Sequence, residues 1–200
     1  SFFSQKFGYG NPIITYIGEI NEGRGLHKLL PSLIILKQTY PNFQFWIVGQ
    51  IQRFSGYFQQ LVSSLKEFGL QENVYFTGLV PFSYIPNIIN ESDIMVNVGQ
   101  KTFTTEISPP IKVYEYMSCA KPVISTRPFV ESLIEDEKTG ILFDLEKEDS
   151  FFNRINPLVN NSEYCESLGK SAREYILENH SKESAIKKYK HAFSYLATLR

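Results

Sequence analysis

Short apolar runs that end in glycine alternate along this chain with segments of helical periodicity. Ile13 to Ile17 is a continuous, largely β-branched run closed by Gly18, and Phe43 to Val48 is closed by Gly49. Such continuous runs are typical of strands buried on both faces, as in parallel sheets covered by helices. Between these two runs, leucines recur at helical spacing from Leu26 to Leu36. The alternation predicts an α/β domain with a Rossmann-like, doubly wound parallel sheet.

The same alternation continues to about residue 143. The pattern predicts four further strands, at Val74–Phe76, Ile94–Val98, Val123–Ser125 and Gly140–Phe143. It also predicts four helices, over Leu26–Tyr40, Phe58–Phe68 and Ser83–Asn90 and after Pro110. Pro31 would either kink the first helix or mark its late start. Residues 145–200 keep helical periodicity without a strand signal, which predicts two or three closing C-terminal helices. Since the chain starts at Ser1 without an initiator methionine or a signal-type run, we expect a domain excised from a longer protein, with residues 13–200 as the domain and 1–12 as a linker.

The composition excludes several classes of protein. With 42% hydrophobic and 20% charged residues among 200, the chain is globular rather than disordered. A formal charge of -1 supplies no field for a phosphate backbone, so we expect no nucleic-acid partner. Two cysteines, Cys119 and Cys165, form no disulfide framework, and no stretch approaches the roughly 20 apolar residues of a membrane span. A cytoplasmic location follows as the simplest expectation.

The loop after the first predicted strand places Arg24 between Gly23 and Gly25, just before a helix. In an open parallel sheet, ligands bind beyond the carboxyl ends of the strands, where such loops converge. Backbone amides and a guanidinium at this place can hold a diphosphate. A purely structural glycine turn is the alternative interpretation.

The helix predicted after Pro110 carries Lys112 and Glu115 three residues apart. Proline suits a helix start because its missing amide would be unpaired there anyway. The i,i+3 spacing puts both side chains on one face near the helix start, directed to the same edge of the sheet. An ordinary surface ion pair between them is the alternative.

Several of these segments together resemble one family, the GT-B glycosyltransferases of group 1 (family 4), which are retaining enzymes. The similar segments occur in the same order as in that family's C-terminal domain: Tyr16–Gly18 through Arg24–Gly25, Phe45–Gly49, Val74–Gly78, Ser92–Ile94, Glu115–Ile124, and Gly140–Phe143. The resemblance runs from about Ile13 to the end of the chain. It implies that the domain binds a nucleotide-sugar donor, needs no metal or other cofactor, and works with an N-terminal acceptor-binding domain.

The resemblance also implies roles for individual residues. Arg24 corresponds to the basic residue that neutralises the donor diphosphate, and Glu115 to the second glutamate of a Glu-x7-Glu motif, which binds the ribose hydroxyls. With Lys112 they form the expected catalytic set. The expected donor-binding residues are Gly18, Gly23, Arg24, Gly49, Gly78, Leu79, Val80, Pro110, Ile111, Lys112 and Glu115.

Two departures from the family pattern affect the phosphate site. Glu19 stands where the family often has arginine, and the first motif glutamate falls on Ile107, with Glu106 one position away. Ser108–Pro110 replaces a glycine-rich stretch, and its two prolines donate no amide. The chain is closer to a variant that reads Pro-x-Lys-x-x-Glu-Tyr-Met, in which Lys112 restores the missing positive charge.

Other conspicuous residues have simpler interpretations. Trp46 lies within a buried strand and is expected to pack in the core, and Cys119 is expected to be a small buried side chain rather than a nucleophile. The histidines lack the spacing of a metal site or catalytic triad. They are His27, His180 and His191. A C-terminal lysine face would meet either solvent or anionic lipid. It consists of Lys182, Lys187, Lys188 and Lys190.

These inferences lead to an expected function, the donor-binding domain of a retaining glycosyltransferase of the hexosyltransferase type that builds a glycoconjugate or polysaccharide. Two alternatives stay open. A GT-B nucleotide-sugar epimerase would share fold and donor but add water instead of an acceptor. A non-catalytic Rossmann-like binding module is favoured by Glu19 and Ile107. Peripheral contact of the whole enzyme with the cytoplasmic face of a membrane is a further option.

Overall fold

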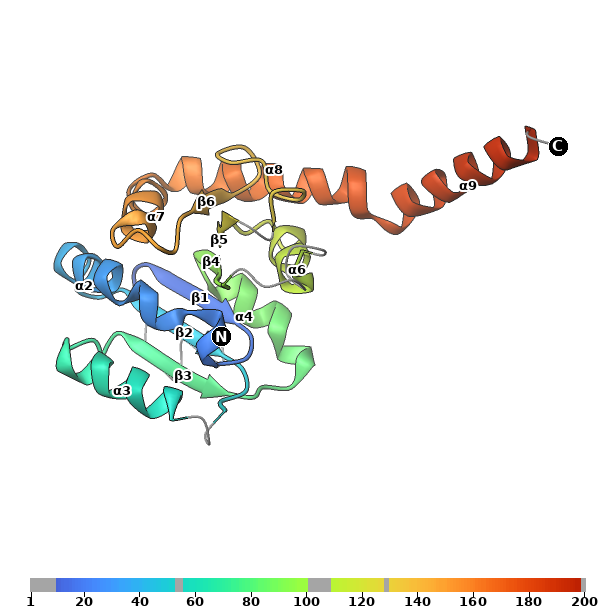
Figure 1. Ribbon diagram of the computed structural model, residues 1–200. Coiled ribbons are helices and arrows are strands. Elements are labelled where there is room, and N and C mark those ends of the chain that lie inside the picture. The colour runs from blue at the N-terminus through green and yellow to red at the C-terminus, as the bar shows by residue number, and fades with distance from the viewer. Residues whose placement is uncertain (1–9, 53–55, 101–108, 128–129, 199–200) are drawn as a thin grey trace.

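Six parallel strands form one sheet in the order β3-β2-β1-β4-β5-β6 (Figure 1). The computed structural model describes residues 10–52, 56–100, 109–127 and 130–198. The strands are β1 (Ile13–Ile17), β2 (Gln44–Val48), β3 (Val74–Gly78), β4 (Ile94–Asn97), β5 (Val123–Thr126) and β6 (Ile141–Phe143). The predicted doubly wound α/β fold is confirmed, with the strand order expected of a Rossmann-like domain.

Helices cover both faces of this sheet. The helices of the described residues are α2 (Leu30–Thr39), α3 (Tyr57–Glu67), α4 (Ile85–Glu91), α6 (Ile111–Ser118), α7 (Ser150–Asn160), α8 (Ser162–His180) and α9 (Lys182–Thr198), with short 3-10 turns η1 (Glu22–Arg24), η2 (Leu26–Leu29) and η3 (Phe82–Tyr84). Pro31 lies in the first turn of α2. The helix therefore starts late, and the leucines before it form η2, because proline fits a first turn and not a helix interior.

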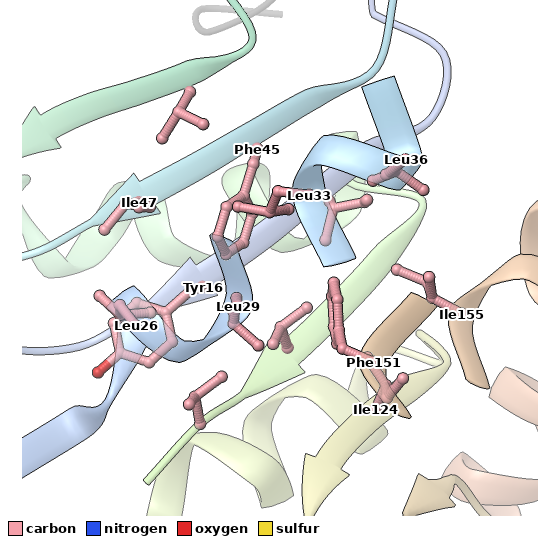
Figure 2. Packing of buried hydrophobic residues seen from close by; sticks show 14 of the residues in the cluster. Tyr16, Leu26, Leu29, Leu33, Leu36, Phe45, Ile47, Ile124, Phe151 and Ile155 are labelled. Carbon is pink, nitrogen blue, oxygen red and sulfur yellow. The ribbon is translucent and has the colours of Figure 1, made fainter. Parts of the chain in front are cut away.

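The core explains why the strand sequences are continuously apolar. Along β2, Phe45 and Ile47 pack with α2 and α3 on one face, while Trp46 and Val48 pack against α4 on the other. Figure 2 shows the first face, where leucines of η2 and α2 lie over Phe45 and Ile47. Trp46 is fully buried, as predicted for a core residue. Burial on both faces leaves no position for an alternating polar residue.

The C-terminal helices close only part of the domain. α7 contributes Phe151 and Ile155 to the core, and α8 packs on α6 through Ala172 and Ile176. In Figure 1, α9 instead extends away from the body of the molecule beyond α8. Its apolar residues are largely exposed at Ile186, Tyr189 and Phe193. Among the described residues, no helix is both long and apolar enough to cross a bilayer.

Candidate functional site

The carboxyl ends of β1, β2 and β3 meet at one edge of the sheet, where each is followed by or ends in glycine. Gly18 N donates to Val48 O at 2.8 Å, and Gly49 N donates to Gly78 O at 3.0 Å. A Cβ on Gly49 would lie 2.1 Å from Gly18 O, so any side chain there would collide with the backbone of the first loop. Three of the predicted donor-binding glycines thus form one tightly packed edge.

The first loop folds over this edge as a capped 3-10 turn. Asn21 Oδ1 accepts from Arg24 N at 3.2 Å, and Gly25, with φ +72°, ends the turn in the left-handed region that favours glycine. Arg24 is half-buried at the end of η1. Its guanidinium makes no hydrogen bond or ion pair with any residue that the structure describes. Its charge is therefore not paired with any carboxylate among the described residues.

Glu19, the acidic departure in the first loop, is held by neighbouring amides. Its carboxylate accepts a hydrogen bond from Asn21 Nδ2 at 2.9 Å and another from the Gln52 side chain. These two donors tie the carboxylate to its own loop and to the segment after β2. These hydrogen bonds stabilise the Glu19 carboxylate, which the sequence pattern puts near the expected diphosphate.

Lys112 reaches the same edge from α6. Pro110 is the N-cap of this helix, in extended conformation, and its carbonyl accepts from Val113 N at 2.9 Å. Lys112 Nζ lies over the Tyr16 ring, 4.3 Å from its centroid, and 3.0 Å from the place of a Cβ on Gly18. Burial, together with the positive charge of Arg24, lowers the pKa of Lys112 to about 7. Two cations thus converge on the loop after β1.

Glu115 lies one turn further along α6 and is half-buried. Within the described ranges its carboxylate has no hydrogen bond or ion pair, and the i,i+3 ion pair with Lys112 does not form. Lys112 instead points to the Tyr16 ring. The helix itself is fastened to β1, because Ile17 N donates to the Tyr116 hydroxyl oxygen at 3.0 Å.

The remaining predicted donor-binding residues flank this centre. Leu79 and Ile111 are 74% and 77% exposed, so they can make new apolar contacts without rearrangement. Val80 and Pro110 are partly buried, and Gly23 is exposed in η1. Ile107 and Glu106, the two candidates for the first motif glutamate, lie outside the described residues.

Sequence reasoning missed the two tyrosines that support the site. Tyr16 and Tyr116 are both fully buried, and burial raises the pKa of each hydroxyl. A tyrosine within an otherwise aliphatic strand was the available signal, because a buried hydroxyl must find a polar partner. Both find theirs in the backbone at the end of β1.

A cavity lined by described residues lies elsewhere, at the amino ends of β1 and β4. It measures about 280 Å³ and is lined by residues that include Pro12, Asp93, Lys121 and Cys165. Ligands of open parallel sheets bind at the opposite edge, so geometry favours the edge that carries Arg24 over this cavity.

Two of the three histidines lie against aromatic rings. His27 makes an edge contact with Tyr57, and His180 with Tyr114. In the part of the chain that the structure describes, no three His, Cys, Asp or Glu side chains are placed to hold a metal ion.

Comparison with known proteins decides the family. The model of the family "Glycosyl transferases group 1" matches residues 1–175. The chain belongs to this family. Among curated relatives, this group 1 chain is 29% identical over 176 residues to spore coat protein SA of Bacillus subtilis, covering 86% of the chain and 45% of the relative. It is 27% identical over 148 residues to poly(ribitol-phosphate) alpha-N-acetylglucosaminyltransferase of Staphylococcus aureus, covering 64% and 30%.

Solved structures support the fold of this group 1 chain. The C-terminal domain of a glycosyl transferase group 1 family protein from Francisella tularensis superposes with a TM-score of 0.77 at 19% identity, covering 86% of this chain and 88% of that domain. Anabaena HepE in complex with UDP gives 0.82 at 18%, covering 96% and 51%. The chain spans about half the length or less of the curated relatives it matches.

Proposed function

We propose that this chain is the donor-binding domain of a retaining glycosyltransferase that uses a nucleotide-activated sugar. The observation that carries the proposal is the convergence of Arg24 and Lys112 on the Gly18 loop, where neither cation forms an ion pair with a carboxylate of the described residues. Two such cations at the carboxyl edge of a parallel sheet match the charge of a diphosphate. Anabaena HepE, which has a similar fold, is solved with UDP and with UDP-glucose.

In the proposed mechanism, the domain stabilises the departing nucleoside diphosphate while an acceptor hydroxyl attacks the same face of the sugar. Positive charge fixed before the reaction stabilises the charge that develops as the glycosidic bond breaks. Arg24 and Lys112 supply that charge, so we propose that no metal cofactor is needed. Glu115 would accept hydrogen bonds from the ribose hydroxyls.

The proposal extends to the rest of the enzyme. An N-terminal domain, joined through residues 1–12, would supply the acceptor site, and residues 13–200 would bind the donor. We place the enzyme in the cytoplasm, in synthesis of a glycoconjugate or polysaccharide, with peripheral contact of the lysine face of α9 at a membrane as an accessory interaction.

Replacing Glu115 by alanine should weaken UDP-glucose binding by about 1.5–3 kcal/mol, the range for hydrogen bonds to a charged group. The same variant should bind UDP and 2′,3′-dideoxy-UDP with more similar affinities than the parent does, since the ribose contact is gone. Isothermal titration calorimetry measures both. Glu67→Ala, an exposed change on α3, is the matched control. Unchanged discrimination between the two nucleotides would contradict the ribose role of Glu115.

Replacing Arg24 by alanine should reduce UDP affinity about tenfold to a hundredfold and leave the weak binding of uridine almost unchanged, because the guanidinium is proposed to contact the diphosphate alone. Arg24→Lys keeps the charge without the bidentate geometry and should lose less. An equal loss for nucleoside and nucleotide would mean that Arg24 only shapes the loop. If the parent chain binds no UDP, GDP or ADP sugar, the non-catalytic module becomes the better interpretation.

A further inference from the structure

Tyr16 lies between the two parts of the candidate phosphate site, the first loop and α6. Its side chain is fully buried in the middle of the sheet, where an aliphatic core offers its hydroxyl no hydrogen-bond partner. Figure 2 shows the Tyr16 ring beside Leu26, at the end of the core nearest the candidate site. Besides packing in the core, Tyr16 contacts site elements with both its hydroxyl and its ring.

The hydroxyl of Tyr16 contacts the backbone of the first loop. It donates to Glu19 O at 3.0 Å and lies 2.7 Å from the place of a Cβ on Gly18. The ring face contacts α6, since Lys112 Nζ lies 4.3 Å from the ring centroid. At that distance a cation is attracted to the electron-rich face of an aromatic ring.

We propose that Tyr16 is a positioning residue of the diphosphate site, holding the Lys112 ammonium beside Gly18 with its ring and fixing the turn at Glu19 with its hydroxyl. This inference rests on the proposed donor-binding function. Tyr16 does not contact the donor; it acts through Lys112 and the loop.

The groups around Lys112 make its charge state sensitive to the contact with the Tyr16 ring. Arg24 of η1 repels the ammonium, and burial disfavours its charge, so the pKa of Lys112 falls to about 7. From β1, the ring of Tyr16 faces the ammonium. The Glu19 carboxylate of the following loop accepts hydrogen bonds from its two amide donors. From α6, the Tyr116 hydroxyl is engaged at the end of β1. Near neutral pH, even a modest attraction by the Tyr16 ring therefore changes the fraction of Lys112 that is charged.

The other titratable group of α6 near Lys112 is Glu115, whose carboxylate forms no ion pair with it among the described residues. Among the residues that the structure describes, the Tyr16 ring is the group that stabilises the ammonium. A bound diphosphate would add an opposite charge and favour proton uptake at Lys112.

The test is calorimetric titration of the chain with UDP-glucose from pH 6 to 9. UDP-glucose is suitable because its diphosphate is esterified at both ends, whereas UDP has a terminal phosphate that titrates near pH 6. Affinity of the parent should fall above pH 7 as Lys112 loses its proton. Tyr16→Phe keeps the ring and should keep this pH profile, with a loss of about threefold from the missing hydroxyl contact. Tyr16→Leu removes the ring and should lose about tenfold, with the pH midpoint lower by about one pH unit.

A second pair of variants separates positioning from a purely structural role. In a Lys112→Met background, Tyr16→Leu should add no loss beyond that of Tyr16→Phe. If Tyr16→Leu does not fold, 3,5-difluorophenylalanine at position 16 keeps the volume and weakens the ring face, and the midpoint should still move down relative to phenylalanine. A midpoint that stays in place in the folded ring variants overturns the positioning role and leaves the proposed function intact. Absence of UDP-glucose binding by the parent at every pH contradicts the proposed function itself, and this inference with it.

Discussion

Replacing Gly49 by alanine should destabilise the domain by about 3 kcal/mol or more, through overpacking and backbone strain together. The added methyl group would lie 2.1 Å from Gly18 O, and this neighbour is backbone rather than a side chain that can swing away. The backbone at Gly49 also has φ +144°, a conformation that residues with a side chain rarely adopt. The loop after β1 or the end of β2 must therefore shift.

The matched control is Gly78→Ala, at the next strand of the same edge. Its φ of +72° also disfavours a side chain, but a Cβ there meets no atom within 4 Å. It should cost only the backbone strain, about 1–2 kcal/mol. Urea unfolding followed by circular dichroism measures both variants. Equal destabilisation at the two positions would mean that the approach of Gly49 to the first loop is looser than the structure has it.

Replacing Lys112 by methionine should stabilise the unliganded domain near and below neutral pH, by about 2 kcal/mol at pH 6.5, because burial disfavours the charged ammonium, which forms no ion pair with the described residues. The pKa of Lys112 is lowered from 10.5 to about 7 in the folded protein. Between these values the unfolded chain binds the extra proton, so the parent gains stability as pH rises, by at most about 1.4 kcal/mol per pH unit. The advantage of methionine should therefore shrink as pH rises from 7 toward 10.

Urea unfolding of parent and Lys112→Met at pH 6.5 and 9 tests this dependence, with Lys66→Met on the exposed face of α3 as the control. The same variant should bind UDP about as weakly as Arg24→Ala and with a smaller effect of salt, since one phosphate-facing cation is gone. A stability difference that does not change with pH would show that Lys112 keeps an ordinary pKa. Stability gained with affinity lost is the pattern expected of a binding residue.

The strands could be predicted because both faces of this sheet are covered. All of Gln44–Val48 and all but the last residue of Ile13–Ile17 are buried, so the sequence carries a largely apolar signal that glycine then ends. The start of α2 was harder, because leucines before Pro31 follow helical spacing and yet form a 3-10 turn. α9 has the periodicity of a packed helix, and periodicity alone does not reveal whether anything covers its apolar residues.

Local spacing located the site residues but not their contacts. It put Lys112 and Glu115 on one side of a helix, which is compatible with an ion pair or with two separate partners. Lys112 contacts Tyr16 on β1, almost one hundred positions earlier, rather than Glu115. A tertiary contact of that kind leaves no local pattern in the sequence. Glu19 is a similar case, since the amide of Gln52, which donates a hydrogen bond to its carboxylate from beyond β2, could not be found from the loop itself.

The central place of β1 governs when the candidate site can assemble during folding. β1 pairs on one side with β2 and on the other with β4, and the hydrogen bond from Ile17 to Tyr116 joins residues 99 positions apart. Contacts closed by short crossovers form with less loss of chain entropy than contacts between such distant segments. The β1-β2-β3 half can thus order first, while Lys112 reaches the Gly18 loop only after the β1–β4 seam has closed. Transient separation of β1 from β4 would move Lys112 away from Arg24 and abolish donor binding while the first three strands stay folded. Loss of donor binding would therefore report loss of cooperativity between the two halves of the sheet.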